Sequence, residues 1–561
     1  MKQEFDVCIV GSGAGASPIA YELSKSGFKV IVLEKGAWFK TEDFAKDEMV
    51  ATRRSVYTPN TMDEYHVLER GNEKDGWKTT TTHVSGFDFW NGNMVGGSTN
   101  LMSAYFHRMK PRDFKLKTTY GEIKGGNVAD WAIDYSDLEP YYAKVESLIG
   151  VSGKVVKHRF LEPRSTKDFP YPPLKENIIS TWIDESAKKL NIEVFPTPRG
   201  ILSLPKEDRE SCFYSNYCGS YGCNSNAKSS ARVALLNQAK ATGNCTILPL
   251  RKVFWLEEEE KKIKRIHFYT PEGKKDFVTA KITVVAGQAI ETARLLLMSK
   301  SKNFPNGIAN NSNQVGKNLI FSGGGVGSGI FKYSDLSEDK IKELKKTGLW
   351  VNRASQHWYE IEDKALGDKK KGGTIDFVFE HANGITKAFK QKYDDKGGLV
   401  YGSALKQKLK EAFTQQRKLN FEVFVDWTPN DNCFVELDTK LVDKWGDPVA
   451  KIRLGYLSYD LEIGRYLAKK AEHILKKMGA KEVKSHISGS PTANLQAGGC
   501  RFGNDPRTSV LDKNCRAHEV DNLYVTDGSF MPTGGSTTFT FTIYANSFRV
   551  ADVIKNRLKT N

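Results

Sequence analysis

A strand, a glycine-rich turn, a helix and a second strand follow one another within the first 36 residues of this chain. The apolar run 5–10 has strand length, and the turn Gly11-Ser12-Gly13-Ala14-Gly15-Ala16 follows it directly. A helical pattern then leads to Gly27, and a second apolar run over 28–33 ends on Glu34. This order predicts a βαβ unit in which the helix N-terminus faces the phosphates of a dinucleotide.

The residues of this turn have separate physical roles. Gly11 permits the tight turn, Gly13 lets the backbone approach a pyrophosphate, and Ala16 keeps the helix close to the strand. Glu34 stands 23 residues after Gly11, where a carboxylate accepts from a ribose 2′-OH, which argues against a 2′-phosphate. We expect Gly11, Gly13, Gly15, Ala16 and Glu34 to bind the cofactor.

The composition is that of an ordinary globular enzyme, at 39% hydrophobic and 27% charged residues. No apolar run reaches the ~18 residues that a membrane helix needs, so we expect no membrane span. The net charge of +16 favours an anionic partner, whether an acidic substrate, an acidic electron carrier, a membrane surface or nucleic acid. The sequence contains no nucleic-acid-binding module to support the last of these, and no nucleic-acid partner is expected.

Three further segments carry glycine turns beside apolar runs. The small-residue stretch 92–100 suits a loop whose amides approach a ligand, although a flexible surface loop fits it equally well. An antiparallel meander over 245–285 returns to a strand–glycine–helix turn. Near the C-terminus, a strand ends on an acid and a glycine, before a loop and a helix over about 542–554. The cofactor-binding residues expected from these segments are Gly96, Gly97, Asn100, Val253, Ala286, Gly287, Asp527 and Gly528.

The chain resembles the glucose–methanol–choline (GMC) flavoprotein oxidoreductases, and within them the flavoprotein subunit of bacterial gluconate 2-dehydrogenases. The N-terminal GSGAGA with Glu34, the loop 96–100 and the turn at 286–287 contribute, but the run 498–510 and Asp527-Gly528-Ser529 are the most specific match. The resemblance implies FAD, a Rossmann-like FAD-binding domain built from several chain segments, an interposed α+β substrate domain, and oxidation of a sugar-type C–OH group.

Two residues depart from the family pattern. Leu495 stands where members usually carry a histidine six residues before the motif arginine, and Thr538-Phe539 stands in place of their Asn-Pro pair. We expect Asn494 and Thr538 to orient the substrate hydroxyl. Neither side chain is a competent base, so a His, Asp, Glu or ordered water of the substrate domain must take the proton. His486 and His357 are the first candidates.

Cys212, Cys218 and Cys223 are spaced as C-x5-C-x4-C on a glycine-rich loop. Three thiolates at this spacing could hold a [3Fe-4S] cluster. Structural thiols, or one disulfide and a free cysteine in an exported protein, are the alternatives. Zinc is less suited, because a fourth ligand is not at a standard spacing.

The sequence therefore predicts an α/β protein with FAD-domain segments at 1–150, 206–320 and 490–561, a lid or substrate segment at 151–205 and a substrate domain at 321–489. We expect an FAD-dependent dehydrogenase of a sugar, polyol or sugar acid, with gluconate to 2-ketogluconate as first choice. An oxidase using O2 and a non-catalytic electron-transfer subunit are the alternatives.

The electrons need an acceptor, and the chain has no CxxCH haem motif. We expect a cytochrome c partner and, from the resemblance, a small exported subunit. The first residues show no basic and then apolar leader pattern, so we expect no export signal on this chain. We therefore expect a periplasmic location through that partner, with cytoplasm as the alternative.

Overall fold

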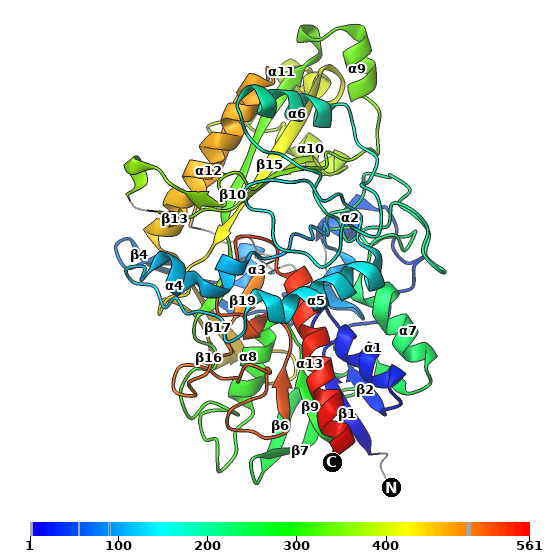
Figure 1. The fold of residues 1–561 in the computed structure, drawn as a ribbon, viewed down its shortest axis with the longest axis vertical. Coiled ribbons are helices and arrows are strands. Elements are labelled where there is room, and N and C mark those ends of the chain that lie inside the picture. Colours follow the sequence, from blue (N-terminus) through cyan, green and yellow to red (C-terminus); the bar gives the residue numbers. More distant parts are fainter. Residues whose placement is uncertain are drawn as a thin grey trace.

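The computed structural model describes residues 4–560, except 54, 55, 88, 90, 368 and 490–494. Two layered lobes meet across the middle of the molecule (Figure 1). The lobe that contains both chain ends carries the nucleotide-type sheet, and the opposite lobe carries a large antiparallel sheet. No helix in the described part of the chain is long and apolar enough to cross a membrane.

A five-stranded parallel sheet forms the centre of the first lobe. Its strands, in spatial order, are β20 (Leu523–Val525), β9 (Ala280–Val285), β1 (Phe5–Val10), β2 (Val30–Leu33) and β5 (Cys245–Leu248). Val and Ile dominate the buried positions of β1, β2 and β9, because a parallel sheet is covered on both faces. Segments far apart in the sequence thus build one sheet, as expected for a discontinuous Rossmann-like domain.

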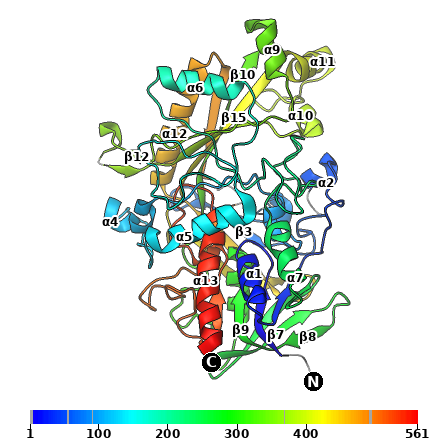
Figure 2. The ribbon, with the colours of Figure 1, turned by 45° about the vertical axis from the view of Figure 1, so that its right-hand side comes forward.

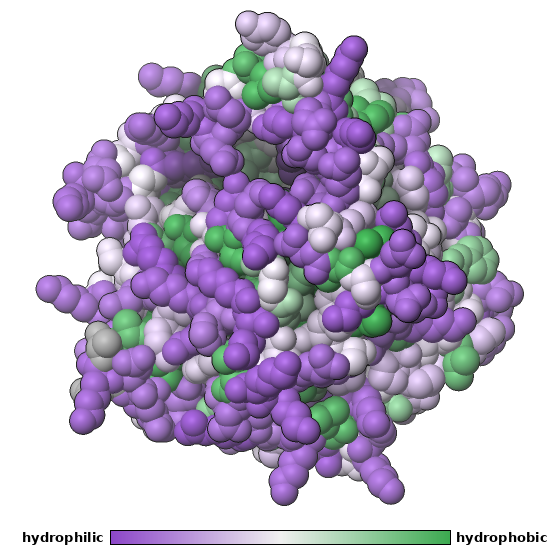
Figure 3. Space-filling view, turned by 90° about the horizontal axis from the view of Figure 1, so that it is seen from above, coloured by the Kyte–Doolittle hydropathy of each residue, from purple (hydrophilic) through white to green (hydrophobic). Residues whose placement is uncertain are grey.

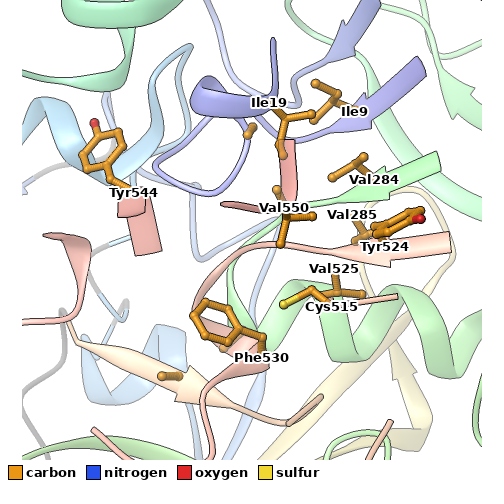
Figure 4. Packing of buried hydrophobic residues seen from close by; sticks show 14 of the residues in the cluster. Ile9, Ile19, Val284, Val285, Cys515, Tyr524, Val525, Phe530, Tyr544 and Val550 are labelled. Carbon is orange, nitrogen blue, oxygen red and sulfur yellow. The ribbon is translucent and has the colours of Figure 1, made fainter. Parts of the chain in front are cut away.

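Helices α1 (Ser17–Lys25), α5 (Tyr135–Val145) and α13 (Thr540–Thr560) pack together on one side of this sheet. Figure 2 shows α1 and α13 side by side in front of the strands. Ile19 of α1 and Val550 of α13 meet Ile9, Val284 and Val525 of the sheet in the core (Figure 4). All five side chains are fully buried, which fixes the C-terminal helix against the N-terminal unit.

Two smaller sheets flank the parallel one, next to helix α8 (Ala289–Met298). The antiparallel meander predicted over 245–285 is confined to β6 (Lys252–Glu259), β7 (Lys262–Tyr269) and β8 (Lys275–Val278), because β5 and β9 join the parallel sheet. The other sheet pairs β3 (Val67–Asn72) and β4 (Gly76–Thr81) with β16 (Cys433–Val442) and β17 (Pro448–Gly455). This pairing crosses the predicted segment boundaries.

The second lobe is built on an antiparallel sheet. Its main strands are β11 (Arg353–Ser355), β14 (Thr374–Phe379), β15 (Gln416–Asp426), β10 (Leu319–Lys332) and β18 (Lys481–Ile487), and β19 (Gln496–Gly498) pairs with β10. Helix α12 (Ser458–Lys477) packs on β10 and β15, and α6 (Ile179–Lys189) packs on α12. Gly327 of β10 leaves room for the Phe421 ring of the neighbouring strand β15, since a Cβ on Gly327 would lie 2.0 Å from that ring.

Short elements surround both lobes, with α9 and α11 at the top of the second lobe and α7 beside α1 in the first (Figure 1). They are α2 (Glu48–Arg53), α3 (Thr82–Ser85), α4 (Leu116–Tyr120), α7 (Asn237–Ala241), α9 (Glu338–Leu344), α10 (Gly384–Lys390), α11 (Gly402–Lys410), β12 (Glu360–Ile361) and β13 (Lys370–Lys371).

Candidate active site

A cavity of about 320 Å³ runs between the two lobes. One end is lined by Glu34 and Val253 of the parallel-sheet lobe, and the other by Glu422 of the antiparallel sheet. The carboxyl ends of β1, β2, β9 and β20 all open onto it, which is where open α/β sheets bind ligands.

The glycine turn lies at the end of β1, as predicted. Gly11 has a φ of +94°, and a Cβ there would lie 2.3 Å from the Ala286 carbonyl oxygen. A Cβ on Gly15 would lie 2.6 Å from the backbone of Asp527, so this glycine lets α1 approach the end of β20. Gly13 is different, because nothing lies within 4 Å of its Cβ position. The space beside Gly13 is therefore open toward the cavity.

Glu34 faces the same turn. Its Oε2 accepts from the Ser12 hydroxyl at 2.5 Å, and its Oε1 accepts from the Gly36 amide at 2.7 Å. Burial raises the pKa of this carboxyl group, and the two hydrogen bonds oppose that shift. The Ser12 hydroxyl also accepts from the Gly96 amide at 2.9 Å, which ties the second loop to the first turn.

The predicted loop 96–100 forms a 3-10 turn over Gly97–Asn100. Gly97 lines the cavity, and its Cβ position is 3.3 Å from Gly13 Cα, so two glycine backbones approach each other there. Asn100 instead turns inward, donating to the carbonyls of Val95 and Gly97, both at 3.0 Å. Three predicted cofactor-binding residues do not line the cavity: Gly96 and Asn100 of this loop, and Ala16 of the first glycine turn.

Ala286, Gly287, Asp527 and Gly528 also line the cavity. The Asp527 carboxylate accepts from the Gln288 amide at 3.0 Å and the Thr292 hydroxyl at 2.5 Å, which fastens the end of β20 to the start of α8. Burial raises the pKa of Asp527.

The cavity fits FAD. Glu34 suits a ribose, and the open space at Gly13 and Gly97 suits a pyrophosphate at the N-terminal end of α1. Two polar atoms on the cavity wall, Gln288 Nε2 and Asn93 Oδ1, are buried without a hydrogen-bond partner among the described residues. Such atoms are costly unless a ligand satisfies them.

The far end of the cavity is lined by Tyr105, Glu422, Leu495 and Thr538. The Thr538 hydroxyl donates to the Tyr105 carbonyl at 2.6 Å, so its proton is already engaged. Leu495 is apolar and nearly buried. Residues 97–99, 495–496, 538 and 540, which come from three separate segments, all line this one cavity.

Glu422 is the residue that we did not single out from the sequence. It lies in the middle of β15, opposite Val326 of β10, and its side chain hydrogen-bonds the Tyr105 hydroxyl. Burial and the nearby Asp376 raise the pKa of the Glu422 carboxyl group, while Tyr105 and Arg199 lower it. The sequence signal that could have indicated Glu422 is an acidic residue between two apolar residues, Phe421 and Val423, within a predicted strand.

The other predicted catalytic residues lie elsewhere. His486 is an exposed residue of β18 opposite Val326, and it does not line the cavity. His357 packs edge-on against Trp358 and lies 3.5 Å from the Glu193 carboxylate, also away from the cavity. Asn494 falls outside the described residues. No histidine lines the cavity within the described part of the chain.

The structure does not support the predicted iron–sulfur cluster. Among the described residues, no group of three or more His, Cys, Asp or Glu side chains could hold a metal ion, and Cys212, Cys218 and Cys223 are no exception. Lys228 organises this loop instead, donating to the carbonyls of Cys218 and Tyr221 at 2.8 Å. Burial raises the pKa of the Cys212 thiol to about 11, which keeps it protonated.

Fold and cavity together define a flavoprotein with a dinucleotide cradle and a separate substrate lobe. Two GMC oxidoreductase family profiles match residues 174–321 and 429–547. The chain belongs to the GMC oxidoreductase family, the FAD-dependent enzymes that oxidise alcohol groups.

Known relatives extend over almost the whole chain. The fructose dehydrogenase large subunit of Gluconobacter japonicus is 28% identical over 99% of this chain and 98% of its own length. The gluconate 2-dehydrogenase flavoprotein of Pantoea cypripedii is 20% identical over 100% and 95%. A formate oxidase structure from Aspergillus oryzae, in a study of FAD modification, superposes with a TM-score of 0.66 at 15% identity, covering 100% of both chains.

Proposed function

We propose that this protein is a dehydrogenase that oxidises a hydroxyl group of a sugar or polyol, with Glu422 as the proton acceptor. The observation that carries the proposal is the Glu422 carboxylate at the end of the cavity away from Glu34, where the family histidine is replaced by Leu495. The two dehydrogenases named above take their names from a sugar and a sugar acid.

Oxidation of a CH–OH group removes the hydroxyl proton and a hydride from carbon, leaving a carbonyl. FAD, when bound in the cradle, supplies the hydride acceptor. The Glu422 carboxylate takes the hydroxyl proton, and the raised pKa of Glu422 makes it a stronger base than an exposed carboxylate. Tyr105 holds that carboxylate by a hydrogen bond, and Leu495 and Phe424 help to exclude water.

The charges on the cavity wall favour a neutral substrate. Four cationic residues line the cavity in the described chain, and they belong to the Glu34 end: Lys35, Arg251, Lys252 and Arg294. At the other end, a sugar carboxylate would face Glu422 without a lining cation. A neutral sugar or polyol is therefore our first substrate class, and gluconate, oxidised to 2-ketogluconate, comes second.

A cytochrome c partner and a small exported subunit, which would give a periplasmic location, remain part of this proposal. The gluconate dehydrogenase likeness supports the cytochrome. Because oxidases also occur among the relatives, as in the 6'''-hydroxyparomomycin C oxidase of Streptomyces lividus, O2 is the alternative acceptor.

The test is anaerobic mixing of the purified FAD-loaded protein with fructose, glucose, gluconate and a 1,2-diol, while flavin absorbance is followed. We expect bleaching by a neutral substrate, and no peroxide when the same mixture is opened to air. Peroxide at a matching rate would establish the oxidase instead. A flavin that no member of the panel bleaches would contradict the proposal and favour a non-catalytic electron-transfer subunit.

A further inference from the structure

One surface of the second lobe is unusually apolar. Six of the sixteen large hydrophobic side chains that are exposed in the described chain fall within residues 384–413, which we call the α10–α11 patch. Tyr401 is the most exposed of them, at 77%. The six are Ile385, Phe389, Tyr393, Leu399, Tyr401 and Phe413.

Direct contacts join three of these six residues, Phe389, Tyr393 and Leu399, into one apolar cluster. Ile385 and Phe389 are four residues apart on α10, so they share one side of the helix, and Tyr393 follows just beyond its end. The Phe389 and Tyr393 rings pack edge-on at 5.9 Å, and Tyr393 pairs with Leu399 across the following turn. Contiguous exposed apolar surface of this kind marks an interaction site.

The α10–α11 patch is also basic, with seven lysines against three acidic residues and a net charge of +4. Several lysines frame the aromatic rings, such as Lys392, whose Nζ lies 5.1 Å from the centre of the Phe389 ring, and Lys387, at 5.1 Å from that of Phe413. Hydrophobic side chains surrounded by cations match a partner with an apolar centre and an acidic rim. In Figure 3, seen from the end where α9 and α11 lie, green hydrophobic side chains stand among purple hydrophilic ones.

Two hydrogen bonds connect the start of the α10–α11 patch to the wall of the cavity. Asn383, just before α10, accepts from the Tyr221 hydroxyl at 2.7 Å. The neighbouring Ser220 amide donates to the Leu101 carbonyl at 3.1 Å, and Leu101 lines the cavity. A partner on the patch is therefore close to the wall of the cofactor site.

We propose that the α10–α11 patch docks an electron-accepting protein with an acidic surface. This inference rests on the proposed dehydrogenase function. Each oxidation of CH–OH to C=O releases two electrons and two protons, so a one-electron carrier docks twice in each turnover and the protons pass to solvent.

An anionic lipid surface is the competing occupant, since exposed aromatic residues and lysines also bind membranes. The position of the α10–α11 patch favours the electron-accepting protein over the lipid surface. A membrane contact needs no path to the cavity, whereas an electron carrier does, and the loop 218–222 joins the patch to the cavity wall through Leu101.

The test measures binding of the full-length FAD-loaded protein to the soluble domain of cytochrome b5, an acidic haem protein. One variant reverses three exposed lysines, K390E/K396E/K406E, and another removes two exposed rings, F389S/Y401S. The control K262E/K264E reverses two exposed lysines of β7 in the other lobe. A basic cytochrome c and vesicles of phosphatidylcholine, with and without phosphatidylglycerol, complete the probes.

We expect the wild type and the control to bind cytochrome b5, with an affinity that falls as salt rises, and each patch variant to bind about tenfold more weakly or worse. During turnover, the patch variants should lose reduction of cytochrome b5 by a similar factor while reducing a small dye normally. Binding needs no substrate, so it separates failure of this inference from failure of the proposed function. Binding to anionic vesicles alone, equal binding by all variants, or no binding to cytochrome b5 would each overturn the inference.

Discussion

Replacing Glu422 by Gln should remove the proton acceptor while preserving the shape of the cavity wall. Nothing else at that end of the described cavity replaces it, because Leu495 is apolar and the Thr538 hydroxyl already donates to the Tyr105 carbonyl. A positioned general base contributes about 10²–10⁴-fold, which corresponds to about 3–5 kcal/mol of the barrier. We therefore expect kcat/KM to fall within that range, and E422D, one methylene shorter, to restore part of it.

The pH dependence gives a second signature of the same residue. A base must be ionised, so kcat/KM of the wild type should rise as pH passes through the Glu422 pKa, which burial shifts above 4.5. At higher pH the rate should level off. E422Q should lack this rising limb.

The assay is stopped-flow reduction of the flavin between pH 4 and pH 9, with FAD content measured from the visible spectrum of each variant. The matched control is E462Q, an exposed glutamate of α12 in the same lobe. If E422Q keeps FAD, reduces it at the wild-type rate and keeps the rising limb, then Glu422 is not the base.

Three other predictions follow from the structure. G13A should leave the melting temperature of the FAD-free protein unchanged but weaken FAD binding, whereas G15A should lower that melting temperature, because only the Gly15 Cβ would collide with backbone. Burial raises the pKa of Asp460 from 3.8 to about 7, so its contribution to stability is present at low pH and is lost as pH rises from 4 through 7. Urea unfolding of the wild type should show a loss of about 3 kcal/mol between pH 5 and pH 8, and D460N should flatten it. D426N should lower kcat without loss of FAD, and its effect should largely disappear in the E422Q background; additive effects in the double variant would show that Asp426 does not act through Glu422.

The dinucleotide cradle could be predicted because its signals are local. The Gly11 turn, the helix after it and Glu34 lie within 36 residues, and each is required by backbone geometry that the sequence itself determines. The same holds for Asp527-Gly528, which follows the short buried strand β20 after one residue, Thr526. These elements reach their positions by pairing in one parallel sheet, so correct local assignments were enough.

Glu422, the proposed proton acceptor, could not be predicted in this way. On β15 the residues alternate between two faces, and Glu422 occupies a position that, from sequence alone, reads as the solvent side of a half-covered sheet. That face of β15 becomes a cavity wall only because the parallel-sheet lobe covers it in the folded protein. The cysteine spacing was misleading for a different reason: Lys228, five residues after Cys223, is buried and donates hydrogen bonds to the carbonyls of the same loop.

Strand β15 also explains how a base on one lobe can serve a cofactor held by the other. Asp426 lies four residues beyond Glu422, on the same face of the strand. Its Oδ1 accepts from the Gly535 amide at 2.7 Å, and its Oδ2 accepts from the Ser536 hydroxyl at 3.0 Å. This loop leads to Thr538, whose hydroxyl holds the Tyr105 backbone, and Tyr105 in turn holds Glu422. The strand that carries the proposed base is thus hydrogen-bonded to the segment in which the family usually carries a catalytic side chain. A base on the substrate lobe, in place of one on that segment, therefore still has a fixed position relative to the FAD-binding lobe.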